Sequence, residues 1–465
     1  MPDFTFEQLQ AWTAGRRVGG APVRVTGFSN DTRSLRPGDL FVALRTANRD
    51  GHDFLGDAAA RGASCALVSR EVPGAPLPQL VVCDALESLQ RIAAVWREKF
   101  PGTVYAVTGS VGKTSTKDLL KCILGPDATQ ATHANLNNLL GVPLTLLGAD
   151  ASAHAAAVVE AGMSEPGELE RSAWMIRPDI AVVTNVQPAH LAGLGSLEGI
   201  AREKSALCRQ TSALGLSVFP ADCLAYEAFR RLLGRRVPVV FGDAPAPEKR
   251  DGVYDVVRAR LTRSGAGHAL LLAGEIVGEH AFGVGAVSDG MARNAALAAT
   301  AALLGGVPPA RIRAALAGWT PSPGRGELRE SGGKLFYVDC YNASPASMVD
   351  AAECFVRRTP ESKPRLFVLG GMNELGDGAA ELHREVGRKL PLRPGDVLAL
   401  FGGLSAEIGK GAVEAGFAPC AVRACANVDE LREVLTAFPG SVMIKGSRGY
   451  ALERALPADI GGDAH

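Results

Sequence analysis

The sequence predicts an α/β protein of three domains around a central P-loop nucleotide-binding α/β domain with a parallel-rich sheet. Three observations lead to this prediction. The chain has 465 residues, enough for about three domains of roughly 150 residues each. Short apolar runs alternate with helical segments over most of the chain, as in βαβ units. A strand, a glycine-bearing loop and a helix start follow one another between residues 103 and 124.

A smaller N-terminal α/β domain is predicted over residues 1–85. Its apolar runs DLFVAL (residues 39–44) and CALVS (residues 65–69) have the length of short buried strands. A helical pattern over residues 85–100 follows them and leads into the central domain. We therefore expect a small sheet and then a connecting helix.

The central domain is predicted over residues 86–319. AAAVV (residues 155–159) and IAVVTNV (residues 180–186) are typical of strands buried on both faces of a parallel sheet. A glycine-containing stretch, residues 242–285, is expected to hold a small antiparallel excursion, and residues 292–304 a helix. Ligands of such sheets bind at the carboxyl ends of the strands.

A separate Rossmann-like, doubly wound α/β domain is predicted over residues 320–465. The segment TPSPGRG (residues 320–326) is rich in proline and glycine, which is typical of a linker. Ser344 and Pro345 suit the N-cap and first position of a helix, and Asp377 suits the cap of another. The strand-like runs after the linker are residues 334–339, 365–370, 397–401 and 441–444.

The motif TGSVGKTST (residues 108–116) indicates a bound nucleotide. It lies between the apolar run TVYAV and a helical segment, so backbone N–H groups and the helix dipole face one anion site. Lys113 would reach the β- and γ-phosphates of ATP, and Thr114 would hold Mg²⁺. The first glycine of the usual pattern would fall at Val107, so a plain surface turn is the alternative. The candidate phosphate ligands are Thr108, Gly109, Ser110, Gly112, Lys113, Thr114 and Ser115.

Three further side chains lie near the ends of predicted elements. Glu160 directly follows AAAVV, so it suits a magnesium ligand beside the loop; a solvated carboxylate is the alternative. His190 comes four residues after the strand that ends at Val186, but a lone histidine is more often structural or exposed. Lys204 lies on a predicted helix, residues 197–207, where a lysine is normally solvated.

The composition indicates which classes of partner and which cell compartment to expect. Lys plus Arg and Asp plus Glu are equal at 49 each, so the charge balance gives no support for nucleic acid as a partner. We find no apolar run of about 18 residues and no secretory signal in MPDFTFEQLQ, so no membrane span is expected. Nine scattered cysteines without a CxxC pair predict reduced thiols in a cytoplasmic protein. A monomer is the default expectation.

The chain resembles the Mur ligases, the ATP-dependent amide-forming enzymes of peptidoglycan synthesis, over nearly its whole length. The first domain carries DTR (residues 31–33), PGDLFVAL and DGHDF. The second carries TGSVGKTST, NLNNLLGVPLTLL, VVEAGMSEPGE and AHLAGLGSLEGIAREKS. The third carries YNASPASM, LGGMNELGD and KGSRGYALE, which resemble the branch that adds D-alanyl-D-alanine. This order implies a first domain for the UDP-sugar-peptide, a second for ATP and a third for the incoming dipeptide.

The resemblance implies a role for the central candidates. Lys113 and Thr114 would bind phosphates and Mg²⁺, and Glu160 and His190 would be magnesium ligands. Lys204 matches a lysine that is carbamylated in the family, and carbamylation converts a cation into an anionic oxygen ligand for a second Mg²⁺. The catalytic set implied is Lys113, Lys204, His190 and Arg325.

Substrate contacts are implied in the same way. Asn294 would lie beside adenine, Asp339 would hold the ribose, and Arg325 would contact phosphate across the domain gap. The site for UDP-N-acetylmuramoyl-tripeptide would include Thr32, Arg33, Asn137 and Asn138. The site for D-Ala-D-Ala, where an arginine fork suits a carboxylate, would include Asn342, Lys445 and Arg448.

The implied reaction activates the tripeptide carboxylate as an acyl phosphate, with release of ADP, and the dipeptide amine then displaces phosphate. Two magnesium ions, Lys113 and Arg325 would screen the two anions. Because these groups lie in different domains, we expect a hinge at residues 320–326. The third residue of the tripeptide, diaminopimelate or lysine, is left open.

Several positions depart from the family pattern. Gly290-Met291 stands where His-Asn or His-Met is usual, which puts an adenine contact in doubt. Leu139, Val338 and Ser344 also replace the usual residues. The alternatives are a Mur ligase that adds another amine and a non-catalytic nucleotide-binding scaffold. Folylpolyglutamate synthases share the phosphate loop, but no other motif here favours them.

Overall fold

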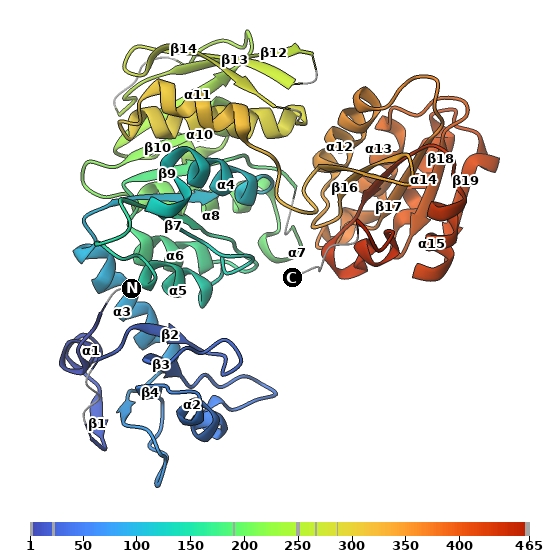
Figure 1. Cartoon of the computed structure of the whole chain (residues 1–465). Coiled ribbons are helices and arrows are strands. Elements are labelled where there is room, and N and C mark those ends of the chain that lie inside the picture. The colour runs from blue at the N-terminus through green and yellow to red at the C-terminus, as the bar shows by residue number, and fades with distance from the viewer. Residues whose placement is uncertain are drawn as a thin grey trace.

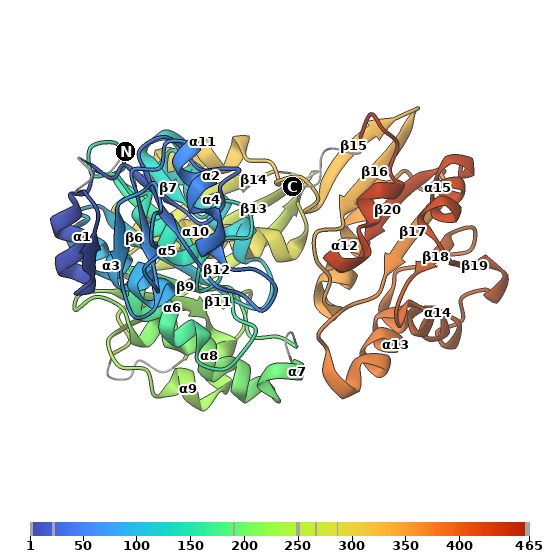
Figure 2. The same cartoon turned by 90° about the horizontal axis from the view of Figure 1, so that it is seen from below.

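The chain folds around three separate β-sheets in a computed structural model that describes residues 3–20, 24–188, 191–247, 252–265, 267–285 and 287–460. Figure 1 shows the first sheet (blue) at one end of the central part and the third sheet (orange to red) beside it. Seen from below, the third part lies to one side of the central part (Figure 2), and its helix α12 (Pro345–Arg358) contacts α10 (Asp289–Leu304). Most strand pairs are parallel, which confirms the predicted fold class.

The first sheet has the strand order β1-β5-β4-β3-β2, and only β1 runs antiparallel to its neighbour. Helix α3 leaves it, capped by Asp84, and packs on the central part, where the Trp96 indole N–H donates to the Ala149 carbonyl at 2.9 Å. The first and central sheets therefore share one apolar core. The elements are α1 (Phe6–Thr13), β1 (Arg16–Val18), β2 (Gly27–Ser29), β3 (Asp39–Val42), α2 (Leu55–Ala60), β4 (Cys65–Val68), β5 (Gln79–Val81) and α3 (Ala85–Lys99).

The central sheet has the order β14-β13-β12-β11-β10-β9-β6-β8-β7, parallel from β7 to β12 and antiparallel from β12 to β14. The predicted antiparallel excursion is thus confirmed at one edge of this sheet. The strands are β6 (Thr103–Thr108), β7 (Thr129–Ala131), β8 (Ala156–Glu160), β9 (Ile180–Val183), β10 (Leu216–Pro220), β11 (Arg235–Phe241), β12 (Val257–Ser264), β13 (Gly267–Gly274) and β14 (Gly278–Val284).

Helices cover both faces of the central sheet. Helices α4, α10 and α11 pack on one face, and α3, α5, α6 and α8 pack on the other. The strands between these layers are almost completely buried, which explains their continuous apolar runs. The helices are α4 (Lys113–Leu124), α5 (Gly141–Leu147), α6 (Glu168–Ile176), α7 (Leu191–Leu194), α8 (Leu197–Arg209), α9 (Glu227–Arg230), α10 (Asp289–Leu304) and α11 (Pro309–Gly318).

The third sheet has the order β15-β16-β20-β17-β18-β19 and is parallel except for β15. One core lies under α12, α13 and α14, and a second lies under α15 on the opposite face, as a doubly wound fold requires. The elements are β15 (Glu327–Ser331), β16 (Lys334–Asp339), α12 (Pro345–Arg358), β17 (Arg365–Gly370), α13 (Ala379–Lys389), β18 (Val397–Phe401), α14 (Ser405–Glu414), β19 (Val422–Cys425), α15 (Val428–Ala437) and β20 (Ser441–Lys445).

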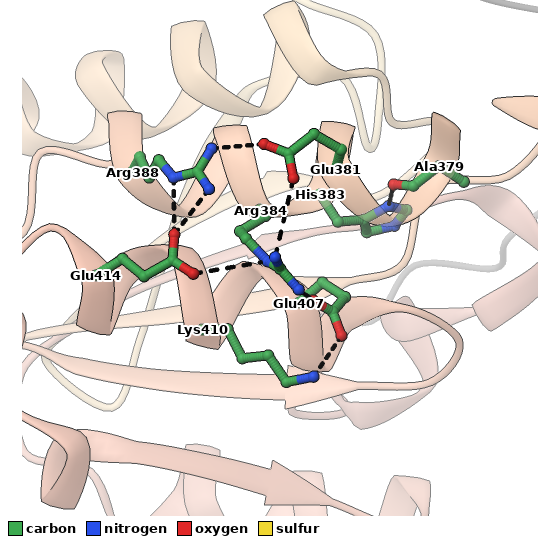
Figure 3. Close-up of polar contacts among 8 residues, drawn as sticks. All are labelled: Ala379, Glu381, His383, Arg384, Arg388, Glu407, Lys410 and Glu414. Atoms are coloured by element: carbon green, nitrogen blue, oxygen red, sulfur yellow. Dashed lines mark hydrogen bonds and ion pairs between the residues drawn. The ribbon is translucent and has the colours of Figure 1, made fainter. Parts of the chain in front are cut away.

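Helices α13 and α14 approach each other through two glycines. A Cβ atom on Gly387 would lie 2.0 Å from the Ile408 carbonyl oxygen, and one on Gly411 would lie 1.9 Å from the Arg384 carbonyl oxygen. The two backbones are therefore in direct contact. Figure 3 shows the ion-pair network beside this contact, which joins Arg384, Arg388 and Lys410 to Glu381, Glu407 and Glu414.

Some local predictions were right and others were wrong. Ser344 caps α12 and Pro345 is its first residue, as predicted. Asp377 instead lies in a 3₁₀ turn, and α13 begins after Gly378 without a side-chain cap. Strand β9 ends at Val183 rather than Val186. Within the part of the chain that the structure describes, no helix is both long and apolar enough to span a lipid bilayer.

Candidate active site

The phosphate loop connects β6 to α4 and is braced by residues that follow β9. Gly112 has φ +85°, a left-handed conformation that favours glycine. The Thr184 hydroxyl donates to the Val111 carbonyl at 2.5 Å, and the Asn185 side chain bonds both the N–H and the carbonyl of Val111 at 3.0 and 2.9 Å. The loop is thus held open at the carboxyl end of the central sheet.

Lys113 opens α4 and turns back over its own loop. Its ammonium donates to the carbonyls of Gly109 at 2.8 Å and Ser110 at 3.4 Å. Burial lowers the pKa of Lys113, the Glu160 carboxylate raises it, and the Arg325 charge lowers it again. Glu160, at the end of β8, and Arg325, in the segment before β15, therefore both affect the pKa of Lys113. The Lys113 ammonium thus donates to carbonyl oxygens of the loop, and a bound phosphate would accept these hydrogen bonds in their place.

Thr114 and Ser115 lie in the first turn of α4, half-buried and buried respectively. Thr108 is fully buried at the end of β6, and its hydroxyl oxygen has no hydrogen-bond partner among the described residues. Asn294 of α10 lies against the loop, because a Cβ on Gly112 would be 2.3 Å from its amide nitrogen. The predicted adenine residue therefore does adjoin the predicted phosphate residues.

Glu160 is the last residue of β8 rather than the residue after it, and it is 1% exposed. One carboxylate oxygen accepts from the Asn137 amide at 2.8 Å, and the other has no partner in the described part of the chain. An unpaired buried carboxylate oxygen is costly, so this position fits a cation. A buried Glu160 contradicts the solvated alternative.

Lys204 is buried, not solvated as its local sequence predicts. It lies on the inner face of α8 and is 1% exposed. Burial first, and then the charge of Lys113, lower the pKa of Lys204 well below its ordinary value. No three His, Cys, Asp or Glu side chains gather as a metal cluster among the described residues, and His190 lies outside them.

Asp339 and Lys445 pair at the carboxyl ends of β16 and β20. The Lys445 ammonium, 2% exposed, donates to the Asp339 carboxylate at 2.7 Å and to the Asn342 carbonyl at 3.0 Å. Lys445 thus holds the predicted ribose ligand and the YNASP turn, while the Asn342 side chain is exposed. With its ammonium already bonded to Asp339 and Asn342, Lys445 positions these neighbouring residues, and this role comes before any contact with substrate.

Tyr341 brings two predicted arginines to one aromatic ring. The guanidinium carbon of Arg325 lies 3.9 Å from the ring centroid, and that of Arg448 lies 5.6 Å from it. The Tyr341 N–H donates to the Gly324 carbonyl at 3.2 Å, and Arg448 also donates to Glu453 at 2.8 Å. Tyr341 was not predicted as a site residue, although its place inside the YNASP motif was a signal for it.

The substrate candidates of the first and central domains hold local structure. Arg33 pairs with Asp31 at 2.6 Å on the surface, next to the half-buried Thr32. The hydrogen bonds of Arg33 lower the pKa of Asp31 to about 2. The Asn138 side chain accepts from the backbone N–H of Gly141 at 2.8 Å at the start of α5. Only Asn137 among these residues bonds directly to a candidate metal ligand.

A cavity of about 960 Å³ lies away from the phosphate loop. It is lined by the β15–β16 edge, by α15 and by residues after β20, with Arg448 as one wall. Because it contains none of the loop residues, we place the reaction at the loop and not in this cavity.

Comparisons with known proteins place the chain among characterised sequences. Three family models match: the Mur ligase family, catalytic domain over residues 24–97, the Mur ligase middle domain over 107–302, and the Mur ligase, glutamate ligase domain over 324–448. UDP-N-acetylmuramoyl-tripeptide--D-alanyl-D-alanine ligase of Escherichia coli is 31% identical, with 98% of each chain covered. The enzyme of that name from Bacillus subtilis is 30% identical, with 93% of this chain and 92% of that one covered.

Solved structures agree with these relatives. The crystal structure of MurF from Acinetobacter baumannii has a TM-score of 0.84 and 28% identity, with 99% of each chain covered. MurF ligase from Thermotoga maritima in complex with ADP has a TM-score of 0.76 and 25% identity, with 92% of this chain and 96% of that one covered. The likeness therefore extends over all three sheets.

Proposed function

Because this chain belongs to the Mur ligase family, we propose that it is the ATP-dependent ligase that joins D-alanyl-D-alanine to UDP-N-acetylmuramoyl-tripeptide in peptidoglycan precursor synthesis. One set of observations supports this most strongly. The Glu160 carboxylate raises the pKa of Lys113 in the phosphate loop, the charge of Lys113 lowers the pKa of the buried Lys204, and one oxygen of Glu160 has no partner among the described residues. That set of residues suits phosphoryl transfer between anions. The proposed compartment is the cytoplasm, and the proposed state is a monomer.

The reaction proceeds through two displacements. An oxygen of the tripeptide carboxylate bonds to the γ-phosphorus of ATP, the bond from that phosphorus to the bridging oxygen breaks, and ADP leaves. The dipeptide amine then bonds to the acyl carbon, loses a proton, and phosphate departs. Lys113 would exchange the carbonyls of Gly109 and Ser110 for phosphate oxygens. Arg325, stacked on Tyr341, would supply positive charge from the third domain.

Two magnesium ions would neutralise charge between the carboxylate and the phosphate. Thr114 and Glu160 would hold one of them, and Lys204 as its carbamate would help hold the other with His190. The free oxygen of Glu160 is the observation that fits a cation. Burial lowers the pKa of Lys204 and so favours its neutral amine. The nitrogen of that amine would bond to the carbon of CO₂ and release a proton, and the carbamate would then offer oxygen ligands.

The remaining assignments are proposed from the family resemblance. Residues 1–85 and 86–319 would bind the UDP-sugar-peptide and ATP, and residues 320–465 would bind the dipeptide. Asn294 would contact adenine, and Asp339, held by Lys445, would contact the ribose. The UDP-sugar-peptide residues would be Thr32, Arg33, Asn137 and Asn138. The dipeptide residues would be Asn342, Lys445 and Arg448.

Phosphate release from Mg²⁺-ATP tests the function. We expect release to require both UDP-N-acetylmuramoyl-tripeptide and D-Ala-D-Ala, with a pentapeptide product confirmed by mass. Tight ATP binding without turnover would contradict the ligase and favour a scaffold. Turnover with a different amine would keep the mechanism and change the second substrate.

Lys204→Ala tests the carbamate. We expect turnover to fall at least a hundredfold and to recover in part when a small carboxylic acid such as formate supplies the missing oxygens. Lys389→Ala is the control, because Lys389 is exposed and forms an ion pair with Glu385 of its own helix, at 3.4 Å. Full activity of the Lys204 variant without added acid would contradict this role.

A further inference from the structure

A carboxylate of the third part lies at the N-terminus of a helix of the central part. The Gly290 N–H in α10 donates to the Asp350 carboxylate of α12 at 3.0 Å, and the Ser288 side chain also hydrogen-bonds to Asp350. Ser288 is itself the N-cap of α10 and accepts from the Met291 N–H at 3.2 Å. The first turn of a helix has free N–H groups and a positive dipole end, so it favours a negative group.

Glycine at position 290 leaves room for this contact. A Cβ atom on Gly290 would lie 2.6 Å from one carboxylate oxygen of Asp350 and 3.2 Å from its Cγ. The carboxylate therefore occupies the space that any side chain at 290 would need. Gly290 and Asp350 form a matched pair, although 60 residues separate them in the sequence.

A second contact joins the same two helices with the charges reversed. Arg357 of α12 donates to the Asp289 carboxylate of α10 at 3.1 Å. Asp289 also accepts from Arg263 at 2.5 Å and from His268 at 2.8 Å, so it is anchored on β12 and β13. A carboxylate of α12 thus bonds to α10, and a carboxylate of α10 bonds to α12. Because the two helices are joined at two places, their relative orientation is fixed.

The fixed orientation brings the third part to the phosphate loop. Glu374 of that part and Arg325, whose guanidinium is held on Tyr341 of that part, both act on the ionisation of Lys113. The Ser322 hydroxyl in the connecting segment donates to the Asp118 carboxylate of α4 at 2.6 Å. The structure therefore has the assembled arrangement, in which groups of the third part face the loop.

We propose that Asp350 is a positioning residue that locks the third domain onto the N-terminus of α10 and so keeps Arg325 opposite the phosphate loop during the reaction. Its hydrogen bonds are to the first turn of α10, so it acts through the orientation of the domain that holds Arg325 on Tyr341. The proposal rests on the proposed ligase function for its kinetic consequence, whereas the contact itself is independent of it. The lock opens when the third domain turns away about residues 320–326.

The test uses Asp350→Ala, Asp350→Asn and Gly290→Ala in the full chain. A hydrogen bond to a charged group shifts an equilibrium by about tenfold or more, so the alanine variants should lower kcat five- to tenfold. The Kd for ATP should change less than kcat does, because the phosphate loop itself is intact and only the contacts from the third part are weakened. Asp350→Asn, which keeps one acceptor oxygen, should recover part of kcat.

The double variant separates a lock from two unrelated defects. Once Asp350 is gone, a methyl group at 290 has no carboxylate to displace, so Gly290→Ala should add nothing to Asp350→Ala. Fluorescence energy transfer between dyes on the exposed Cys83 and Cys420 should report a wider distribution of distances in both alanine variants. Glu385→Ala, which removes an exposed carboxylate of α13 that pairs with Lys389, is the control and should match the wild type.

Two outcomes would overturn the proposal. One is multiplicative loss of kcat in the double variant, and the other is an unchanged distance distribution in Asp350→Ala. If the wild-type protein makes no pentapeptide, the proposed function fails, but the energy-transfer measurement still decides whether the lock exists.

Discussion

Gly112→Ala tests the phosphate loop most directly. Gly112 has φ +85°, and a Cβ there would lie 2.3 Å from the Asn294 amide nitrogen. A left-handed conformation costs a residue with a side chain about 1–2 kcal/mol. Moving the Asn294 side chain off its rotamer adds about 0.5–1.5 kcal/mol. The free loop of the variant is expected to relax away from this conformation, and ATP binding must then restore it. We take about 2 kcal/mol as that cost, which corresponds to an ATP affinity lowered about thirtyfold.

Calorimetric titration with Mg²⁺ and a non-hydrolysable ATP analogue measures this loss. Gly234→Ala is a matched control, because Gly234 has φ +86° and no atom of the described residues lies within 4 Å of the added Cβ. The control bears the same backbone strain far from the loop, so its affinity should stay within about twofold of wild type. Wild-type affinity in Gly112→Ala, or an equal loss in Gly234→Ala, would refute the reasoning.

Two further predictions concern stability. Asp396 accepts from Arg365 at 2.9 and 2.6 Å, and both side chains are buried. Asp396→Ala should therefore lower the free energy of unfolding of the third part in urea by about 3–5 kcal/mol, because it leaves a buried charge unpaired, and the double variant Arg365→Met with Asp396→Leu should lower it far less. Equal losses in the two proteins would contradict this. Burial tends to raise the pKa of Asp289, but the bonds from Arg263 and His268 and the charge of Arg357 lower it from 3.8 to about 2. The stabilisation that Asp289 gives is therefore complete above pH 3.8 and is lost as pH falls through about 2. Asp289→Asn should remove this pH dependence of the unfolding free energy. Wild-type and variant profiles of unfolding free energy against pH that run parallel would contradict this.

Several strands that lie inside a sheet were predicted from their apolar runs, whereas β10 and β11 of the central sheet were not. Runs at 103–107, 334–339, 365–370 and 397–401 correspond to β6, β16, β17 and β18 with almost the same bounds. Strands β15 and β19 were missed, because they form the two edges of the third sheet and need no apolar run. Strand β9 is shorter than its run, since Thr184 and Asn185 leave the sheet to hold the phosphate loop.

The candidate site was predictable only in part. The loop motif located Lys113, but the environment of Lys204 depends on what covers α8. A signal existed, because Lys204 lies four residues from Ile200 and from Cys208, on the buried stripe of that helix. Pairs such as Asp339 with Lys445 join residues 106 positions apart, and helical or strand periodicity carries no information about them.

The departure at Gly290 shows how a local rule can mislead. From the sequence, the missing side chain suggested only the loss of an adenine contact. The structure shows that the glycine makes room for a carboxylate from another domain. An inference from one position cannot find such a partner, whereas a joint change at positions 290 and 350 among relatives would reveal it.

The backbone contact between α13 and α14 makes the third part rigid, so that it is expected to turn as one body. With no gap at Gly387 or Gly411, neither helix can slide past the other, and the ion pairs of Figure 3 resist their separation. Cys420 lies just before β19, at the edge of the sheet farthest from the connecting segment. A rotation of a few degrees at residues 320–326 would therefore be magnified at Cys420, which makes this thiol a sensitive gauge of a movement too small to measure at the phosphate loop.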